Sequence, residues 1–183
     1  MTGTVMIVLV ILVLSIAIIL FLRSMWTTYI IFDYERGVKF DKGMYTDVIG
    51  PGKYTFLDST TRIDCFDLRP SLLQLNGQEL LSADNVSLKL SLVIKYQITN
   101  PLELVTNYEN YHDYLYTSAQ LKIRELISSI SLEEILSNRK VLNDNLNENI
   151  INNLSMTGLT IQSIDIKDIM LSSELKKVYK IQS

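Results

Sequence analysis

VMIVLVILVLSIAIILFL, residues Val5–Leu22, is apolar at every position except Ser15 and contains neither a charge nor a proline. Written as an α-helix with a rise of about 1.5 Å per residue, the stretch is roughly 27 Å long, close to the hydrocarbon thickness of a bilayer. A core helix of a soluble domain is usually shorter and carries a polar stripe. The stretch therefore predicts a helix that spans a membrane or inserts deeply into it.

Two other interpretations of this stretch are open but less favoured. A cleavable signal peptide has basic residues before its apolar run and a small-residue cleavage site after it. Met1–Thr4 carries no Lys or Arg, and Leu20–Arg23 offers no such site. A shallow hairpin that enters and leaves by one face needs a central helix breaker, which the run lacks. We therefore expect a single-pass N-terminal anchor.

The residues that flank the run predict its orientation. Arg23, Trp26 and Tyr29 follow the run in the order expected at a membrane interface, a cation and then amphipathic aromatic residues. Nearby positive charge lies only on the C-terminal side, at Arg23 and then from Arg36 onward. By the positive-inside rule, the body of the protein is expected on the cytoplasmic side.

Composition limits what the rest of the chain can be. Roughly 150 residues follow the first thirty, enough for one compact domain or two small subdomains. The formal net charge of −3 indicates no general attraction to nucleic acid. Cys65 is the single cysteine and His112 the single histidine, which excludes an intrachain disulfide framework and a His/Cys metal cluster.

The segment after the anchor is rich in β-branched and aromatic residues. We expect a first strand at Thr28–Val38, a turn at Lys39–Gly43, a return strand at Met44–Ile49 and a break at Gly50–Gly52. Further strands are expected at Lys53–Leu57, Arg62–Leu68 and Leu72–Leu75, with Asn76–Gly77 as a turn.

The clearest strand is Val86–Ile98. Apolar residues alternate with polar ones along it, and only Val93 interrupts the alternation. This pattern predicts a long strand with one buried face and one wet face, crossing a curved antiparallel sheet.

After this strand the period of the pattern changes to that of helices. Helices are expected at Leu102–Tyr108, Tyr111–Ile130, Leu132–Leu136 and Asn138–Leu154, followed by a return strand at Leu159–Ile169. Asn100 with Glu103, and Ser131 with Glu134, have the spacing of capping boxes, and Gly158 suits the end of the last helix. The expected inward residues are Leu115, Ala119, Ile123, Leu126, Ile127, Val141, Leu142, Leu146, Ile150 and Leu154.

No combination of side chains predicts a catalytic, cofactor or metal site. Cys65 lies between Asp64 and Asp67, which would raise its pKa, so a buried or incidental thiol is expected. His112 has no partner at a recognisable spacing and is expected at a surface or an interface. The acidic residues Glu133, Glu134, Asp165 and Asp168 are expected to cap helices or to line solvated strand faces.

Four tyrosines gather where a helix is expected to begin: Tyr108, Tyr111, Tyr114 and Tyr116. Core packing with a wet rim is the simpler interpretation. The alternative is a contact between subunits, because tyrosine is enriched at protein interfaces.

The order of these segments and seven short motifs closely resemble the SPFH or band 7 family of stomatins, prohibitins and flotillins, and the stomatin-like (slipin) members in particular. The motifs are Tyr34–Val38, Gly50–Gly52, Asp67–Arg69, Ser82–Val86, Tyr96–Pro101, Leu136–Arg139 and Gly158–Leu171. Each motif is weak alone, but all seven occur in the family's order. The chain departs from the family at Met156–Thr157, where an aromatic residue is usual, and at Ser172–Ser173, where a proline is common.

The resemblance implies an α+β fold, with an N-terminal transmembrane helix before an SPFH domain. The expected division is an anchor at 1–27, a mainly β subdomain at 28–100 and a second subdomain of helices and a return strand at 101–172. Residues 173–183 are expected to begin a C-terminal helix that other members continue as a coiled coil.

The resemblance also implies a non-enzymatic membrane scaffold without a cofactor. Many copies would oligomerise laterally into arcs, rings or cages, organise a membrane microdomain and gather or regulate clients such as membrane proteases. The alternative is a regulatory subunit that binds one membrane protease or channel one-to-one. An enzyme is disfavoured, because the sequence contains no P-loop, dinucleotide fingerprint or nucleophile elbow.

Overall fold

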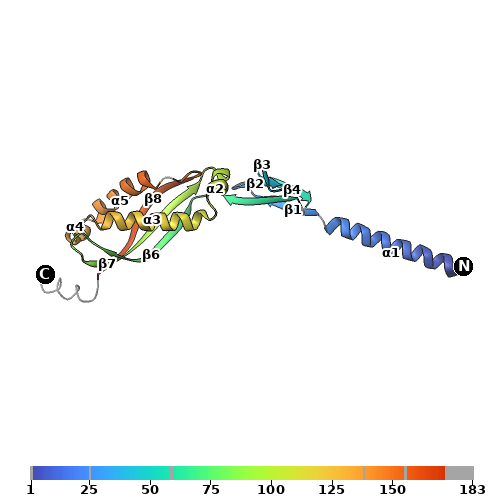
Figure 1. Cartoon of the computed structure of the whole chain (residues 1–183), viewed down its shortest axis with the longest axis horizontal. Helices are drawn as coiled ribbons and strands as arrows, with labels where there is room; N and C mark the ends of the chain where they lie inside the picture. The colour runs from blue at the N-terminus through green and yellow to red at the C-terminus, as the bar shows by residue number, and fades with distance from the viewer. Residues whose placement is uncertain (1, 25, 58–59, 138, 155, 172–183) are drawn as a thin grey trace. The chain divides into compact units, whose positions relative to one another are not determined.

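The computed structural model describes residues 2–24, 26–57, 60–137, 139–154 and 156–171. The chain divides into two compact units, Met1–Asp67 and Leu68–Ser183. Figure 1 shows the first apolar helix, then a group of short strands, then a long-stranded sheet with helices. The expected α+β class with an N-terminal apolar helix is confirmed.

Helix α1, Thr2–Ser24, contains the whole predicted membrane segment. The segment Val5–Ser24 of this helix is long and apolar enough to cross a membrane, and none of the segment is buried. The next strand begins at Trp26, inside the predicted anchor segment 1–27.

The strands of the first unit form two small antiparallel groups. They are β1 (Trp26–Ile31) paired with β4 (Gly52–Leu57), and β2 (Glu35–Asp41) between β3 (Met44–Ile49) and β5 (Thr61–Asp67). The single strand expected at Thr28–Val38 is wrong. A turn divides it, in which the Glu35 amide donates to the Phe32 carbonyl oxygen (2.9 Å) and the Glu35 carboxylate accepts from the Phe32 amide (3.1 Å). The break is needed because β1 and β2 pair with different strands.

The turn expected at Lys39–Gly43 is shorter than predicted. β2 continues to Asp41, so only Lys42 and Gly43 link it to β3, with φ angles of 51° and 80°. Two positive φ angles in a two-residue loop match the right-handed twist of a hairpin. The break at Gly50–Gly52 is confirmed, because β3 ends at Ile49 and β4 begins at Gly52.

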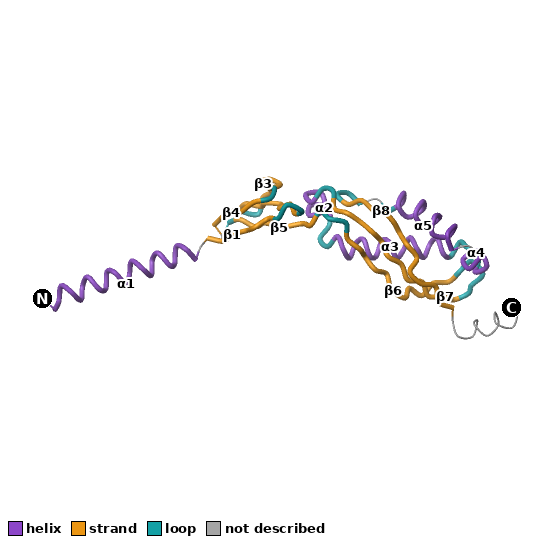
Figure 2. The backbone as a smooth tube through the Cα atoms, turned by 180° about the vertical axis from the view of Figure 1, so that it is seen from behind, coloured by secondary structure: helices purple, strands orange, loops and turns teal. Residues whose placement is uncertain are grey.

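The second unit is built on one antiparallel sheet with the strand order β6-β7-β8. Its strands are β6 (Ser71–Leu81), β7 (Ser87–Ile98) and β8 (Leu159–Leu171), and they curve along their length (Figure 2). The alternation predicted for β7 is confirmed, since every second side chain from Leu88 to Ile98 is buried.

The turn expected at Asn76–Gly77 is wrong. The strand continues through these two residues to Leu81, with a register shift against β7 between Leu75 and Gln78. Gly77 has a φ of 60°, and its amide donates to the Ser91 hydroxyl oxygen at 3.0 Å. The Asn-Gly pair therefore forms a bulge, the other structure that positive φ favours within a strand.

In the described part of the chain, four helices follow β7. They are α2 (Pro101–Asn107), α3 (Tyr111–Ile127), α4 (Leu132–Ser137) and α5 (Arg139–Asn153). α3 packs against β6, α5 packs against β8, and the two helices contact each other. Their buried residues are Leu115, Ala119, Ile123 and Ile127 on α3 and Leu142, Leu146 and Ile150 on α5. Leu126 is only partly buried and Val141 is 50% exposed, so the prediction of a buried Val141 is wrong.

The predicted helix caps have mixed outcomes. The Ser131–Glu134 box is confirmed, because the Ser131 amide donates to the Glu134 carboxylate and the Glu134 amide to the Ser131 hydroxyl, each at 3.3 Å. At α2 the Asn100 side chain instead donates to the Glu103 carboxylate (2.9 Å) and makes no bond to a backbone amide.

Gly158 does not end α5, which stops at Asn153. It has a φ of 80° in the turn that leads into β8, and its carbonyl oxygen accepts from the amides of Thr99 (3.0 Å) and Asn100 (3.1 Å). Its role is to join the start of β8 to the end of β7.

The subdomain division at 100/101 marks the change from strands to helices along the sequence. The compact units instead divide after Asp67, since β7 pairs on both sides with strands of the second unit. Whether 28–100 and 101–172 behave as separate subdomains stays a prediction. The expected C-terminal helix start at 173–183 lies outside the described residues.

Candidate functional site

Helix α1 exposes apolar side chains along its length. Its large apolar side chains between Val5 and Leu22 are 48–69% exposed. The one hydroxyl in that run, Ser15 Oγ, donates to the Leu12 carbonyl oxygen at 2.8 Å, so its hydrogen bond is made within the helix. Apolar surface on this scale, with the polar groups satisfied internally, is suited to the interior of a bilayer.

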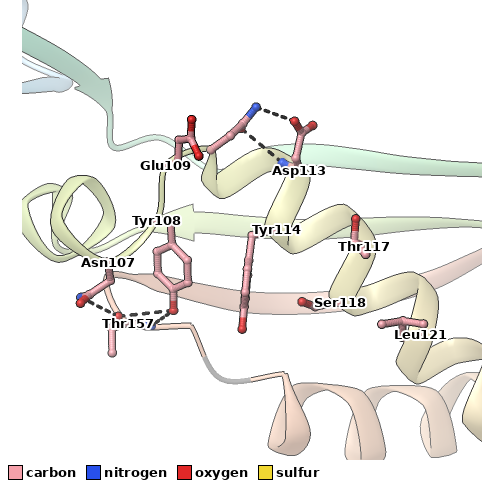
Figure 3. Close-up of a pocket in the computed structure, with 10 residues that line it drawn as sticks. Asn107, Tyr108, Glu109, Asp113, Tyr114, Thr117, Ser118, Leu121 and Thr157 are labelled. Carbon is pink, nitrogen blue, oxygen red and sulfur yellow. Dashed lines mark hydrogen bonds between the residues drawn. The ribbon is translucent and has the colours of Figure 1, made fainter.

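A wide, open groove of about 1110 Å³ lies between the N-terminal half of α3 and the turn that contains Thr157 (Figure 3). Tyr108 and Tyr114 stand side by side in it, with ring centroids 4.7 Å apart. The Tyr108 hydroxyl oxygen accepts a hydrogen bond from the Thr157 amide at 3.2 Å. Glu109 and Asp113 add carboxylates to the lining.

The acidic end of the groove is built by the cap of α3. The Asn110 side-chain oxygen accepts from the amide of His112 at 3.1 Å. The same oxygen accepts from the Asp113 amide (3.3 Å), and the Asn110 amide group donates to the Asp113 carboxylate (2.7 Å), as the dashed lines in Figure 3 show. These contacts hold Asp113 in place by an ordinary helix cap. The groove offers polar and aromatic groups to a partner.

The structure separates the four tyrosines of the predicted cluster. Tyr108 and Tyr114 share the groove, whereas the Tyr116 hydroxyl oxygen accepts from the Gln78 side chain (3.2 Å) on β6. The Tyr111 ring lies against the His112 ring, with centroids 4.1 Å apart and a 30° tilt between the planes, and burial raises the pKa of Tyr111 to about 12. The subunit-contact hypothesis stays a prediction, and the tyrosines that line the open groove are Tyr108 and Tyr114.

His112 is exposed at the start of α3, and its Nδ1 lies 3.2 Å from the Tyr96 hydroxyl. This exposure agrees with the surface or interfacial position expected for His112. Its absence from catalysis stays a prediction.

Cys65 is exposed on β5, so the prediction of a buried thiol is wrong and the incidental thiol remains. Its pKa is raised, first by partial desolvation of the sulfur and then by the charges of Glu35 and Asp64. The direction of the shift was predicted from the sequence, but the part played by Glu35 was not. Glu35 approaches only because β2 pairs with β5, which places Gly37 opposite Cys65.

Two of the four acidic residues considered as candidates, Glu134 and Asp165, have structural partners. Glu134 caps α4, and the Asp165 carboxylate accepts from the side chains of Asn143 (3.2 Å) and Ser163 (3.0 Å). Glu133 and Asp168 lie at exposed and partly exposed positions. Within the described part of the chain, no three His, Cys, Asp or Glu side chains are grouped as a metal site would need.

Two motif residues hold the second unit together in ways that the sequence did not reveal. The Asp84 carboxylate accepts from the Ser82 hydroxyl (2.6 Å) and from the Leu132 amide at the start of α4 (3.0 Å), and the first of these bonds chiefly lowers the Asp84 pKa. The Arg139 guanidinium donates to the carbonyl oxygens of Ile166 (2.6 Å) and Lys167 (2.9 Å). Both residues stabilise the fold, which explains their motifs without a binding site.

Several known proteins are similar in sequence to this chain. An uncharacterised protein of Archaeoglobus fulgidus is 32% identical over 173 residues, which are 93% of this chain and 68% of that protein. A stomatin homolog of Pyrococcus horikoshii is 29% identical over 91% of this chain and 62% of its own length. Stomatin-2 of Caenorhabditis elegans is 31% identical over 79% of this chain and 39% of its own. The chain thus spans between 39% and 68% of the length of these relatives.

A sequence model of the SPFH domain / Band 7 family matches residues 29–180, nearly everything that follows the apolar helix. The predicted motifs lie within this range, and the mixed α+β architecture agrees with it. The chain belongs to the SPFH domain / Band 7 family and is stomatin-like within it.

Proposed function

We propose that this protein is a membrane-anchored scaffold whose copies oligomerise laterally into arcs, rings or cages and so organise a patch of membrane. Family membership supports a general membrane-associated scaffold role, and the family is generally non-enzymatic. The observation that carries the proposal is α1, whose apolar side chains are exposed from Val5 to Leu22 and whose segment Val5–Ser24 is long enough to cross a membrane.

The physical basis of the proposal is effective concentration. Anchored domains diffuse in two dimensions, so weak contacts between neighbours act as if each domain were present at high local concentration. The assembly would confine membrane proteins and gather or exclude clients, including membrane proteases.

The mass of the full-length protein extracted in a mild detergent tests this function. Native mass measurement and negative-stain imaging are expected to show arcs, rings or cages of many copies. A small heteromer with one partner protein would contradict the scaffold and support a dedicated regulatory subunit. Replacement of residues 2–24 by an unrelated transmembrane helix is the control. It should preserve assembly, because the proposal requires anchoring rather than a specific helix sequence.

We further propose that the body lies on the cytoplasmic side, as Arg23 at the C-terminal end of α1 indicates. Cys65 is a native probe of this arrangement, since it is the only cysteine and is exposed. A membrane-impermeant maleimide applied to intact cells at alkaline pH should label Cys65 only after permeabilisation. Equal labelling of intact and permeabilised cells would contradict the orientation, and a Cys65→Ser variant controls for specificity.

A further inference from the structure

The two edges of the β6-β7-β8 sheet are treated differently by the rest of the second unit. On the β8 edge, α5 supplies side chains that bond to the strand's backbone. The Asn147 side chain accepts from the Ile164 amide and donates to the Ile164 carbonyl oxygen, both at 2.8 Å. The Asn143 side-chain oxygen accepts from the Ile166 amide at 3.0 Å. This edge is sealed against a further strand.

These bonds also show which backbone groups of β6 point out of the sheet at its opposite edge. Ile164 directs its amide and carbonyl away from β7, so in the antiparallel ladder its partner Ile94 directs its own groups towards Leu73 on β6. Because the direction alternates along a strand, Leu72 and Gln74 direct their amides and carbonyls out of the sheet.

The same alternation applies beyond the bulge of β6. β7 keeps its alternation without interruption, so Leu88 faces Leu80 in the manner that Ile94 faces Leu73. Glu79 and Leu81 therefore also direct their backbone groups outward. Within the described residues, the β6 strand pairs with no strand other than β7 (Figure 2).

The free edge of β6 lacks most features by which proteins prevent strand addition. Ser71–Leu81 contains no proline and no lysine, and its one charged side chain, Glu79, is paired with Lys89 at 2.8 Å. Leu72 and Leu81 are 63% and 54% exposed, one near each end of the strand. The bulge at Asn76–Gly77 lies midway between them.

This edge is complementary to itself. If a second copy of β6 lies antiparallel with the two bulges face to face, Leu72 stands opposite Leu81 of that copy and Gln74 stands opposite Glu79. Each of these pairs joins two residues whose backbone groups already point outward, so both copies donate and accept. The pairing places leucine against leucine and an amide against a carboxylate, and it opposes no like charges.

We propose that the β6 edge is a dimerisation surface, on which a second copy of this chain adds its own β6 antiparallel to form a six-stranded sheet. The pairing closes as a two-fold dimer, because the β8 edges that remain outermost are sealed by α5. The inference rests on the proposed lateral assembly, and it identifies one surface through which neighbouring copies meet.

Disulfide trapping in native membranes tests the register. The full chain carries C65S together with L72C and L81C. In the proposed dimer, the cysteine at position 72 of one copy lies opposite the cysteine at position 81 of the other. The Cα atoms of a hydrogen-bonded antiparallel pair are about 5.5 Å apart, within reach of a disulfide. A covalent dimer is expected under mild oxidation. The single variants L72C and L81C should give none, since identical positions would be about 30 Å apart.

Two further sets of variants complete the test: a pair of cysteines on the sealed β8 edge, and two variants that place charges on the β6 edge. T160C/M170C, at exposed positions of β8, should not cross-link. The charge variants are made in a chain that carries C65S, Q74C and E79C, in which the cysteines at positions 74 and 79 report the dimer by cross-linking. Adding L72K/L81K places like charges opposite each other and should reduce the cross-linked yield at least about tenfold. Adding L72K/L81E places unlike charges opposite each other and should retain the yield. Equal yields from both charge variants would overturn the proposal.

The outcome separates this inference from the scaffold itself. Large assemblies without a 72–81 cross-link would overturn the β6 dimer and leave the scaffold standing. A 72–81 cross-link without large assemblies would support the dimer and contradict the scaffold.

Discussion

Gly158 shows how one residue joins two distant parts of the second unit. Its φ of 80° is a conformation that residues with a side chain rarely adopt, and a Cβ there would collide with the Asn100 carbonyl oxygen and lie 3.0 Å from the Leu104 amide nitrogen. The glycine lets the turn before β8 lie directly on the start of α2.

Gly158→Ala is therefore expected to destabilise the second unit by about 1 kcal/mol for the backbone conformation and by a further ~1–3 kcal/mol for the overlap. Gly77→Ala is the matched control, because Gly77 also has a positive φ, but a methyl group added there would meet no atom within 4 Å. It should cost only about 1 kcal/mol. Urea unfolding followed by circular dichroism measures both, and equal losses would contradict the role of the overlap.

Asp84 makes the stability of the loop before β7 depend on pH. Its folded-state pKa lies below the ordinary value of 3.8, chiefly because of the Ser82 hydroxyl and then the Leu132 amide. A depressed pKa means that this carboxylate contributes stability above pH 3.8, and that the contribution is lost as the pH falls through the folded-state pKa.

Asp84→Asn should therefore unfold at lower urea concentration than the wild type at pH 7, and the difference should shrink below pH 3.8. Glu133→Gln is the control, since Glu133 is exposed in the same region at the start of α4. A difference between Asp84→Asn and the wild type that is constant from pH 7 to pH 3 would contradict this account.

At the scale of elements, sequence patterns predicted the features that depend on residues close together in the chain. The alternation of β7 and the Ser131–Glu134 cap were both predictable, because a buried face and a cap depend on residues close in sequence. The break between β1 and β2 and the bulge at Asn76–Gly77 were not, because each depends on which strand lies alongside. The sealing of β8 by Asn143 and Asn147 was missed for the same reason, since asparagines on a helix are typical of a solvated face.

The Asn147 side chain should contribute more to the stability of the fold than a polar side chain on a solvated helix face usually does. Asn147→Ala leaves the Ile164 amide and carbonyl without their partners, and the expected loss is about 1–3 kcal/mol of unfolding free energy. Asn145→Ala, at an exposed position of the same helix, should be neutral or slightly stabilising because alanine favours helix. The Asn147 variant should also aggregate faster on mild heating, because the β8 edge would be open to strand addition. Equal stability of the two variants would contradict the sealing of β8.

At the scale of the whole molecule, the chain combines a long apolar helix with an α+β body, and it divides into two compact units, the first of which includes the helix. The sequence indicated this combination through the length of the apolar run and the order of seven motifs. It did not identify the groove at Tyr108 and Tyr114, since Thr157 lies far from α3 in the chain. It did not identify the unpaired edge of β6 either, since the strand that lies beside β6 is known only from the sheet order.

The central claim is that anchoring in a membrane drives assembly. Removal of residues 1–24 deletes α1 and leaves β1 intact from Trp26. The most direct measurement is the mass of this deletion variant at micromolar concentration by sedimentation, beside that of the full chain in mild detergent. The account predicts a soluble and mostly monomeric deletion variant and a large assembly of the full chain. A stable large oligomer of the deletion variant would contradict it.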